Sequence, residues 1–497
     1  QADELHSYEE GINCLAQNMI LDFGSPRQFE RAMVTARGVE GITGINTAGH
    51  RHIRSSYYSG TKLAEDEPWN RAKPYSYLVI QPGELRVDYN GPPGVRTFTL
   101  ELADGLLAHR SKGDDGHYNL PGAIVFPTDQ EVGATRGSLP WHLFWGAWKW
   151  TGDRHYLDPI FDNGTGALMA VNANALDLLD ARADWGARIL AGERGRQTET
   201  RQADGRGSAR SNSYRYSATD QFVWQLSGDK TKLERLYAAQ IEECDLLEFI
   251  NTEGSLWIDR VGAPTAELQR ARLGGVALVR NALYPGHAVS WQFTAPAKAD
   301  DVAILVPDAT RTAFTVIAYN LSTAPVNAEL TGWNVDPGVW EITQGLDTND
   351  DNIADQASET RTAAFERSAS VALTFPPRAT TVLTFKLKTP GTPYWSRPDL
   401  GLDPEDVIIK GRDVSVTVHS LGAVPSPETS VALRDASGRV LAVEKLSSLA
   451  APTDLQPKTA TVTLHLPAGA DAHGGTVEID PEHKLGEITV RNNAVKL

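Results

Sequence analysis

The spacing of apolar residues changes near residue 255, and this change constrains the fold more than any other feature of the chain. Before it, apolar residues recur at helical spacing, as with Phe98, Leu102 and Leu106. After it, short runs rich in β-forming residues alternate between apolar and polar positions, as in residues 314–319. We therefore expect a multidomain α + β protein that is helical at first and then built from β-sheets.

The helical part is expected to cover residues 1–255. Two predicted helices end in the pairs Gly152-Asp153 and Gly228-Asp229, and each Asp is placed to cap the helix that follows. Such junctions indicate αα-hairpins in series. The predicted helices span residues 5–22, 28–38, 97–110, 141–150, 156–161, 167–179, 185–191, 217–226 and 230–249, with a β-hairpin at residues 75–80 and 85–89.

The β part divides in two at a Pro-rich stretch. Strand-like runs separated by Pro, Gly and Asn turns predict a β-sandwich over residues 256–388. Residues 389–405 contain several prolines and are predicted to be a linker. Residues 406–497 then form a second, smaller all-β unit.

Composition excludes several classes of protein. The formal net charge of −16 disfavours general nucleic-acid binding, and no apolar run approaches the ~20 residues that cross a bilayer. Cys14 and Cys244 are too few for a disulfide-dense scaffold, and they form either one disulfide or two separate buried thiols. The chain starts at Gln1, as a mature secreted form or a piece of a longer protein would.

The αα-hairpins with Gly-Asp junctions resemble the (α/α)-toroid carbohydrate-active enzymes, such as heparinase-, alginate- and chondroitin-lyase-like proteins. In that group a β-sandwich commonly follows the toroid, and the resemblance covers roughly residues 1–390. It implies an enzyme that cleaves polysaccharides. The predicted helices are too few for a complete toroid, so the toroid is open or its beginning lies on a missing N-terminal segment or a second chain.

Residues 406–497 resemble the bacterial cell-adhesion-related Ig-like domain. That domain carries an N-x-G strand and a closing pattern of D-P, E and N-N. The matching residues are Gly422, Asp480, Pro481, Glu487, Asn492 and Asn493, with Ser420 in place of the first Asn. The resemblance implies an exported accessory module that serves adhesion or spacing and carries no chemistry.

The first candidate site is the polar segment at residues 49–62. β-Elimination of a uronate needs a group that neutralises the carboxylate, a base for the C5 proton and an acid for the leaving oxygen. This segment offers all three, or it is simply a hydrogen-bonded polar loop. Its candidate catalytic residues are Tyr58, His52 and Arg54, its candidate substrate-binding residues are His50 and Arg51, and His50 and His52 could also contribute to a metal site.

The second candidate site lies at residues 210–220, after an arginine-rich tract that begins near residue 193. Arginine forms bidentate contacts with carboxylates and sulfates. We expect Tyr216 and Arg215 to be catalytic, with Asn212 and Tyr214 binding substrate; the alternative is a solvated loop before a helix. Trp141 and His142 open an aromatic helix that is either core or a sugar-stacking surface.

An acidic loop predicts a structural calcium ion. Oxygen ligands recur at the spacing of a calcium-binding loop, similar to the repeats of dockerins and thrombospondin type-three modules. The alternative is an acidic β-turn. The candidate ligands are Asp347, Asn349, Asp351, the backbone carbonyl of Ile353, and Asp355.

Taken together, these features predict a secreted or periplasmic enzyme that cleaves an anionic, uronate-containing polysaccharide by β-elimination. Basic segments in an acidic chain fit a site focused on a polyanion. The alternatives are a glycoside hydrolase on the same scaffold and a non-catalytic, glycan-binding adhesion protein. Neither a nucleic-acid partner nor a membrane span is expected.

Overall fold

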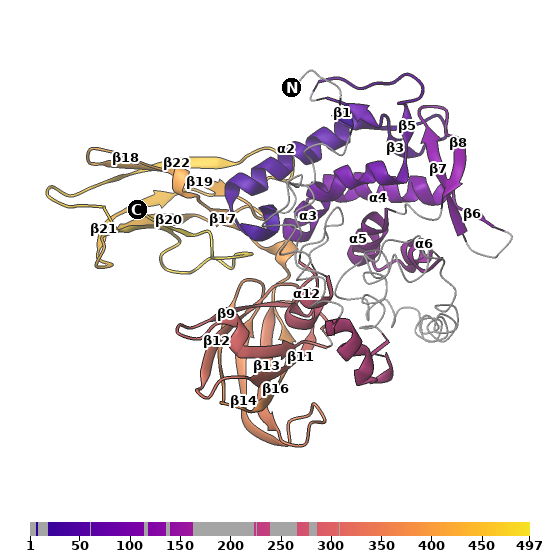
Figure 1. Ribbon diagram of the computed structural model, residues 1–497. Helices are drawn as coiled ribbons and strands as arrows, with labels where there is room; N and C mark the ends of the chain where they lie inside the picture. Colours follow the sequence, from indigo (N-terminus) through magenta and orange to yellow (C-terminus); the bar gives the residue numbers. More distant parts are fainter. Residues whose placement is uncertain are drawn as a thin grey trace, which may run out of the picture. The chain divides into compact units, whose positions relative to one another are not determined.

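The computed structural model describes residues 6–7, 18–59, 61–113, 118–135, 140–162, 223–224, 226–238, 266–277, 286–307 and 309–497 (Figure 1). It divides into two compact units. The first joins Gln1–Thr151 to Thr392–Leu497, and the second is Gly152–Gly391. The unit boundary thus precedes the predicted domain boundary at residues 255/256, and the C-terminal sandwich packs with the first helices.

Helices form the centre of the first unit. Ser25 caps α2 by accepting a hydrogen bond from the backbone N–H of Gln28, and Pro26 occupies the first helical position. The buried side chains of α2 include Phe29, Met33 and Ala36, which share one face of the helix. The helices of this unit before residue 152 include α2 (Pro26–Ile42), η1 (Pro74–Ile80), α3 (Gln81–Asn90), α4 (Pro93–Ala108) and α5 (Trp141–Thr151). They confirm the helices predicted at residues 28–38, 97–110 and 141–150.

The hairpin predicted at residues 75–89 is wrong, because η1 and α3 occupy this segment. The Pro82-Gly83 pair, taken as a turn, lies in the first turn of α3, where proline needs no helical hydrogen bond. The helix ends at Gly91, which has a φ of 62° and packs against the ring of Trp395.

Short strands surround the helices of the first unit. The polar segment predicted as a loop contains two of them, β3 and β4. The strands before residue 151 are β1 (His6–Ser7), β2 (Thr43–Ile45), β3 (Arg51–Ile53), β4 (Tyr57–Tyr58), β5 (Arg71–Ala72), β6 (Ser111–Lys112), β7 (Tyr118–Val125) and β8 (Gln130–Thr135).

The C-terminal part of the first unit is a β-sandwich. One sheet has the order β17-β19-β18 with β22 paired to β19, and the other has the order β21-β20-β23-β24. Val414, Val416 and Val418 alternate inward along β19 and are fully buried. Its strands are β17 (Leu400–Gly401), β18 (Val407–Lys410), β19 (Asp413–Ser420), β20 (Thr429–Arg434), β21 (Val440–Leu446), β22 (Thr459–His465), β23 (Thr476–Ile479) and β24 (Ala494–Lys496).

The segment predicted as a linker is packed. It contains η5 (Tyr394–Ser396) and η6 (Pro404–Asp406). Asp399, which lies between these two helices, is fully buried. Asp399 accepts a hydrogen bond from the hydroxyl of Tyr89 in α3. Residues 389–393, by contrast, are exposed, and the boundary between the two units falls among them.

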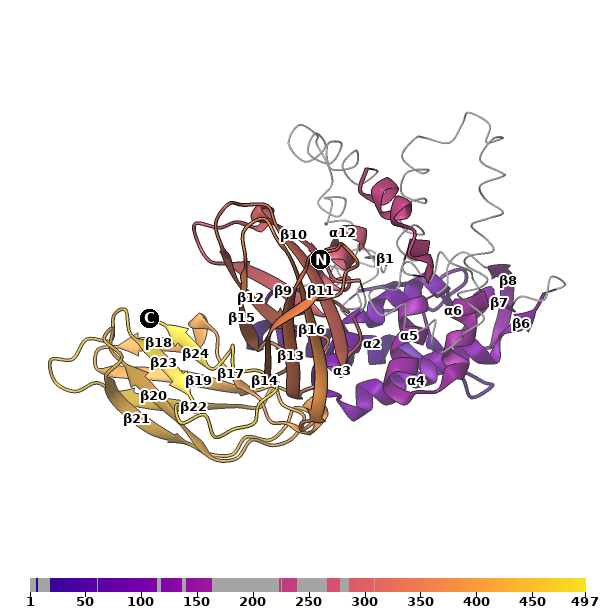
Figure 2. The ribbon, with the colours of Figure 1, turned by 90° about the horizontal axis from the view of Figure 1, so that it is seen from below.

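The second unit contains a β-sandwich after a few short helices (Figure 2). A sheet of order β10-β11-β16-β13-β14 faces a sheet of order β15-β12-β9, and the core includes the stacked rings of Phe314 and Phe385. The helices and strands are η2 (Arg154–Leu157), α6 (Asp158–Asp162), α12 (Ala266–Leu273), η4 (Ala299–Asp301), β9 (Val289–Phe293), β10 (Val302–Leu305), β11 (Ala313–Asn320), β12 (Val326–Gly332), β13 (Gly338–Asp347), β14 (Gln356–Phe365), β15 (Ser370–Phe375) and β16 (Thr380–Pro390).

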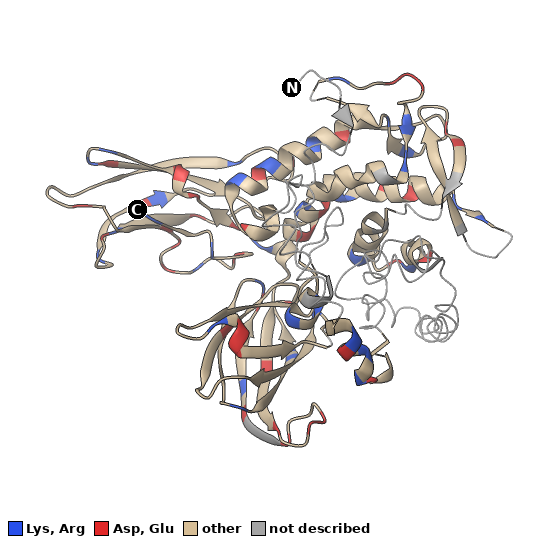
Figure 3. Ribbon diagram, in the orientation of Figure 1, with Lys and Arg blue, Asp and Glu red and all other residues tan. Residues whose placement is uncertain are grey.

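The expected multidomain α + β architecture is confirmed, and so is the strand expected at residues 314–319. The toroid stays a prediction, since much of the segment 163–265 lies outside the described residues, and the Ig-like assignment of residues 406–497 stays a prediction as well. Helix α2 carries both basic and acidic residues (Figure 3). No helix in the described ranges is long and apolar enough to span a membrane.

Candidate functional site

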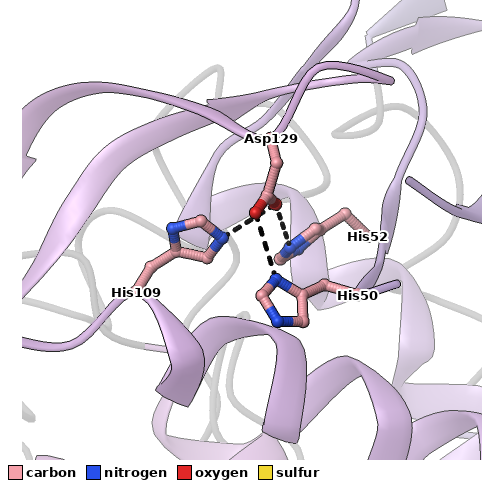
Figure 4. Close-up of side chains that lie close together, drawn as sticks. All are labelled: His50, His52, His109 and Asp129. Atoms are coloured by element: carbon pink, nitrogen blue, oxygen red, sulfur yellow. Dashed lines mark hydrogen bonds and ion pairs between the residues drawn. The ribbon is translucent and has the colours of Figure 1, made fainter. Parts of the chain in front are cut away.

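Four side chains that could hold a metal ion meet in the first unit (Figure 4). His50 directly precedes β3 and His52 lies within it, His109 follows the last residue of α4, and Asp129 lies in the turn between β7 and β8. One potential ligand atom from each residue lies within 4.8 Å of the others. We call these four residues the histidine cluster.

The carboxylate of Asp129 lies at the centre of the histidine cluster. Its Oδ2 atom pairs with Nδ1 of His50 at 3.1 Å, and its Oδ1 atom pairs with Nε2 of His109 at 2.9 Å. Nε2 of His52 lies 3.5 Å from the same Oδ1 atom. The side-chain amide of Asn46 also donates a hydrogen bond to Oδ1. One carboxylate therefore faces three imidazole rings.

Burial and the neighbouring charges set the protonation of this cluster. Burial, and after it the charge of His109, lowers the pKa of His52 to about 4, so this ring is neutral near neutral pH. Burial works against ionisation of Asp129, but hydrogen bonds from His109 and Asn46 still hold the pKa of this carboxyl below its usual range. An ionised carboxylate thus faces at least one neutral imidazole.

Local backbone structure brings the four residues together. The backbone N–H of Asn46 donates to the carbonyl of His50 at 2.8 Å, and β2 pairs with β3. These bonds fix His50 and His52 at the β2–β3 connection. Helix α4 approaches β3 closely at Gly105, where an added Cβ would lie 2.5 Å from the carbonyl oxygen of Arg51. Asp129 has a φ of 64°, a left-handed conformation that Asp tolerates better than most residues.

The other ring nitrogens of two histidines have partners outside the cluster. Nδ1 of His109 pairs with Oε1 of Glu131 at 2.9 Å, and Nδ1 of His52 pairs with the hydroxyl of Tyr77 at 3.2 Å. These contacts fix the ring orientations. Both leave Nε2 directed toward Asp129.

The remaining residues predicted in the segment 49–62 point to other partners. Arg51 pairs with Glu101 and with Oγ1 of Thr43, and Arg54 pairs with Glu65. The hydroxyl of Tyr58 is buried and makes no hydrogen bond within the described part of the chain, and burial raises its pKa. The segment therefore unites His50 and His52, but among the described residues no hydrogen bond or ion pair joins Tyr58 or Arg54 to them.

His142 lies in a separate buried pair. Its Nδ1 atom contacts both carboxylate oxygens of Glu84, at 3.0 and 3.1 Å, and both side chains are almost inaccessible to solvent. Trp141 starts α5, and its side chain lies outside the described residues. The predicted site at Asn212, Tyr214, Arg215 and Tyr216 and the cysteines Cys14 and Cys244 also lie outside them.

The predicted calcium loop connects β13 to β14. Asp347 accepts hydrogen bonds from the backbone N–H groups of Asn349, Asp350 and Asn352, and Asp355 accepts from the backbone and hydroxyl of Thr348. These bonds shape the loop without an ion. Calcium binding by Asp347, Asn349, Asp351, Ile353 and Asp355 stays a prediction.

His109 and Asp129 were absent from the sequence-based site. Each lies more than fifty positions along the chain from His52, so no local motif joins them. Their only sequence signals are local: His109 ends a helical pattern, and Asp129 follows a proline in a turn between strands.

Comparisons with known proteins reveal no family. No family model and no curated protein matches the chain. A β-porphyranase of glycoside hydrolase family 86 from the human gut bacterium Bacteroides plebeius aligns at 10% identity and a TM-score of 0.11, over 33% of this chain and 34% of its own. A β-glucuronidase from Ruminococcus gnavus aligns at 11% identity and a TM-score of 0.12, over 32% and 33%. The chain thus spans about a third of either protein.

Proposed function

We propose that this protein is a carbohydrate-active enzyme that cleaves an acidic, uronate-containing polysaccharide. The observation that carries the proposal is a stacked aromatic pair in the first unit. The rings of Tyr57 and Trp69 lie 4.8 Å apart with an interplanar angle of 26°, and Trp69 is 43% exposed. A flat, exposed aromatic face is the surface on which sugar rings stack.

Guanidinium groups flank the segments that carry this pair. The backbone N–H of Ser56 donates to the carbonyl of Trp69 at 2.9 Å, which joins the two segments. Arg54 precedes this junction and Arg71 follows it, and both pair with exposed glutamates. A uronate carboxylate can replace either glutamate, because arginine binds carboxylates through two parallel hydrogen bonds.

Tyr58 fits the role of proton donor in β-elimination. In this reaction a base takes the C5 proton, a double bond forms between C4 and C5, and the bond from C4 to the glycosidic oxygen breaks. Burial raises the pKa of Tyr58, so its phenol is protonated but is a weaker acid than an exposed tyrosine, and this role requires its buried hydroxyl to open toward the leaving oxygen. His52 is buried and serves the histidine cluster, so this proposal assigns the base to another residue, and the sequence-based candidate Tyr216 lies outside the described residues.

Glycoside hydrolysis is the alternative reaction. The aligned solved structures are glycoside hydrolases, but their overlap with this chain is too small to choose between the two reactions. An extracellular or periplasmic location belongs to the same proposal, because acidic polysaccharides are met outside the cytoplasm.

The test is to incubate the full chain with a panel of acidic polysaccharides. Ultraviolet absorbance of an unsaturated uronate would identify β-elimination, and reducing ends without this absorbance would identify hydrolysis. Trp69→Ala should raise KM about fivefold, since a lost stacking contact is worth on the order of 1 kcal/mol. The matched control is Tyr319→Ala, which removes an exposed aromatic ring from the second unit. The proposal fails if no substrate is cleaved, or if the two variants behave alike.

A further inference from the structure

His109 lies between two carboxylates, and a neutral imidazole can donate a hydrogen bond to only one of them. Nδ1 of His109 lies 2.9 Å from Glu131, and Nε2 lies 2.9 Å from Asp129. A neutral imidazole carries one N–H and one lone pair. Either a second proton or a cation must therefore lie between one ring nitrogen and its carboxylate.

His52 adds an independent sign of a missing partner. Its side chain is 1% exposed, and its Nε2 atom lies 3.5 Å from Oδ1 of Asp129 (dashed line in Figure 4), a contact too long and poorly aligned to count as a hydrogen bond, and it has no hydrogen bond to any other described residue. A buried polar atom without a partner is costly, and such atoms are rare in native proteins. A metal ion between Nε2 and the carboxylate would satisfy both groups.

The outer contacts match those of metal-binding histidines. Such histidines usually direct their second ring nitrogen to a carboxylate or another polar group, which fixes the ring. His109 does so with Glu131, and His52 does so with the hydroxyl of Tyr77. The two histidines are thus held with their Nε2 atoms toward one point.

We propose that His50, His52, His109 and Asp129 bind one zinc ion as a structural site. Three imidazoles and one carboxylate form a complete tetrahedral ligand set for zinc, which leaves no position for a substrate. The ion would join β3, the end of α4 and the β7–β8 turn. This inference does not depend on the proposed carbohydrate activity.

The spacing of the ligand atoms suits this ion. Zinc bonds of about 2.0–2.1 Å put neighbouring ligand atoms of a tetrahedron about 3.3 Å apart. Oδ1 of Asp129 lies 2.9 Å from His109 and 3.5 Å from His52, Oδ2 lies 3.1 Å from His50, and the four potential ligand atoms all lie within 4.8 Å of one another. Calcium would instead require six to eight oxygen ligands, whereas three of the four groups here are nitrogens.

Metal content of the full, untagged chain tests the proposal directly. After treatment with a chelator, the protein is dialysed against zinc, cobalt or calcium, and the bound metal is counted. We expect one zinc or one cobalt per chain, the visible absorption bands of tetrahedral cobalt, and a melting temperature that rises with zinc concentration. If the folded wild-type chain takes up neither zinc nor cobalt, the proposal is wrong.

Variants test which residues bind the ion. Asp129→Asn and His109→Gln should lose the bound zinc, whereas His465→Gln should keep it, because His465 pairs with an aspartate in the C-terminal sandwich. Glu131 is half-exposed, so Glu131→Gln should fold, and zinc should bind it about 10–100-fold more weakly. The proposal would be overturned if Glu131→Gln and a folded cluster variant, either Asp129→Asn or His109→Gln, both bound zinc with wild-type affinity. If both cluster variants fail to fold, an unchanged affinity in Glu131→Gln alone would overturn it.

Discussion

Gly105 shows how much the histidine cluster depends on one close contact. Helix α4 approaches β3 at this residue, and a Cβ there would lie 2.5 Å from the carbonyl oxygen of Arg51 and 3.2 Å from Cε1 of His52. The first distance is shorter than real Cβ contacts allow, and a backbone carbonyl cannot rotate away as a side chain can. Glycine at this position therefore lets the cluster close.

Gly105→Ala should lower the free energy of unfolding by about 1–3 kcal/mol, because the helix must shift away from the strand. Gly94→Ala on the same helix is the matched control, since its Cβ would meet nothing within 4 Å. We expect no loss of stability in the control, because alanine favours helix over glycine. Equal effects of the two changes in urea denaturation would contradict this account of the contact.

His419 links α2 to the C-terminal sandwich through two carboxylates. Its Nδ1 atom lies 2.6 Å from Glu30 in α2, and its Nε2 atom lies 3.1 Å from Asp406. Burial alone would lower the pKa of His419, but the hydrogen bonds to Asp406 and Glu30 outweigh it and raise the pKa from 6.5 to about 9. Folding thus favours the protonated form.

Because the folded-state pKa of His419 is raised, its contribution to stability is complete below pH 6.5 and is lost as the pH rises through about 9. Across this range the free energy of unfolding should fall by about 1–3 kcal/mol. His419→Gln should be less stable at pH 6 and should lose this part of the pH dependence. A variant that keeps the wild-type slope in denaturation curves would show that another group is responsible.

At the scale of elements, the spacing of apolar residues predicted the helices that have one buried face. Helices α2 and α4 have one buried face, so their apolar residues repeat at helical intervals. Helix α3 is buried on nearly every side, which removes that period and leaves only the misleading Pro82-Gly83 pair. Only two of the four residues of the histidine cluster could be predicted. His50 and His52 share one segment of the sequence, whereas tertiary packing brings His109 and Asp129 to them.

The β13–β14 loop gives a prediction at the same scale. Asp347 is buried and accepts three backbone hydrogen bonds, so Asp347→Ala should lower the melting temperature even without calcium. If the loop binds calcium, a chelator should lower the melting temperature of the wild type, and Asp347→Ala and Asp351→Ala should abolish that response.

The control for the loop is Asp435→Ala. Asp435 makes similar local hydrogen bonds in a turn of the C-terminal sandwich. This variant should keep the calcium response. A wild-type melting temperature that does not change with chelator would refute the calcium prediction.

At the scale of the whole chain, the sequence predicted a separable C-terminal module, whereas the structure packs it against the first helices. The side-chain amide of Asn90 in α3 donates to the carbonyls of Leu421 and Gly422, at 2.9 and 3.0 Å. Tyr89 contacts Asp399, and His419 contacts Glu30. A sequence motif identifies such a module but carries no information about the surface against which it packs.

Deleting residues 406–497 should therefore destabilise the helical part of the first unit. The deletion exposes the surfaces of α2 and α3 that the sandwich covers, and we expect faster proteolysis of residues 18–113 in the truncated chain. Asn90→Ala removes these two hydrogen bonds and the one that Oδ1 of Asn90 accepts from Arg86, and it should cost about 1–3 kcal/mol. If the truncated chain resists protease as well as the full chain does, the module is separable after all.

The zinc site is the central claim, and anomalous X-ray scattering tests it most directly. Crystals of the full chain grown with zinc would be measured above and below the zinc absorption edge. We predict one anomalous peak bound by Nδ1 of His50, Nε2 of His52 and His109, and the carboxylate of Asp129. Absence of a peak between these residues, with the side chains well ordered, would contradict the claim.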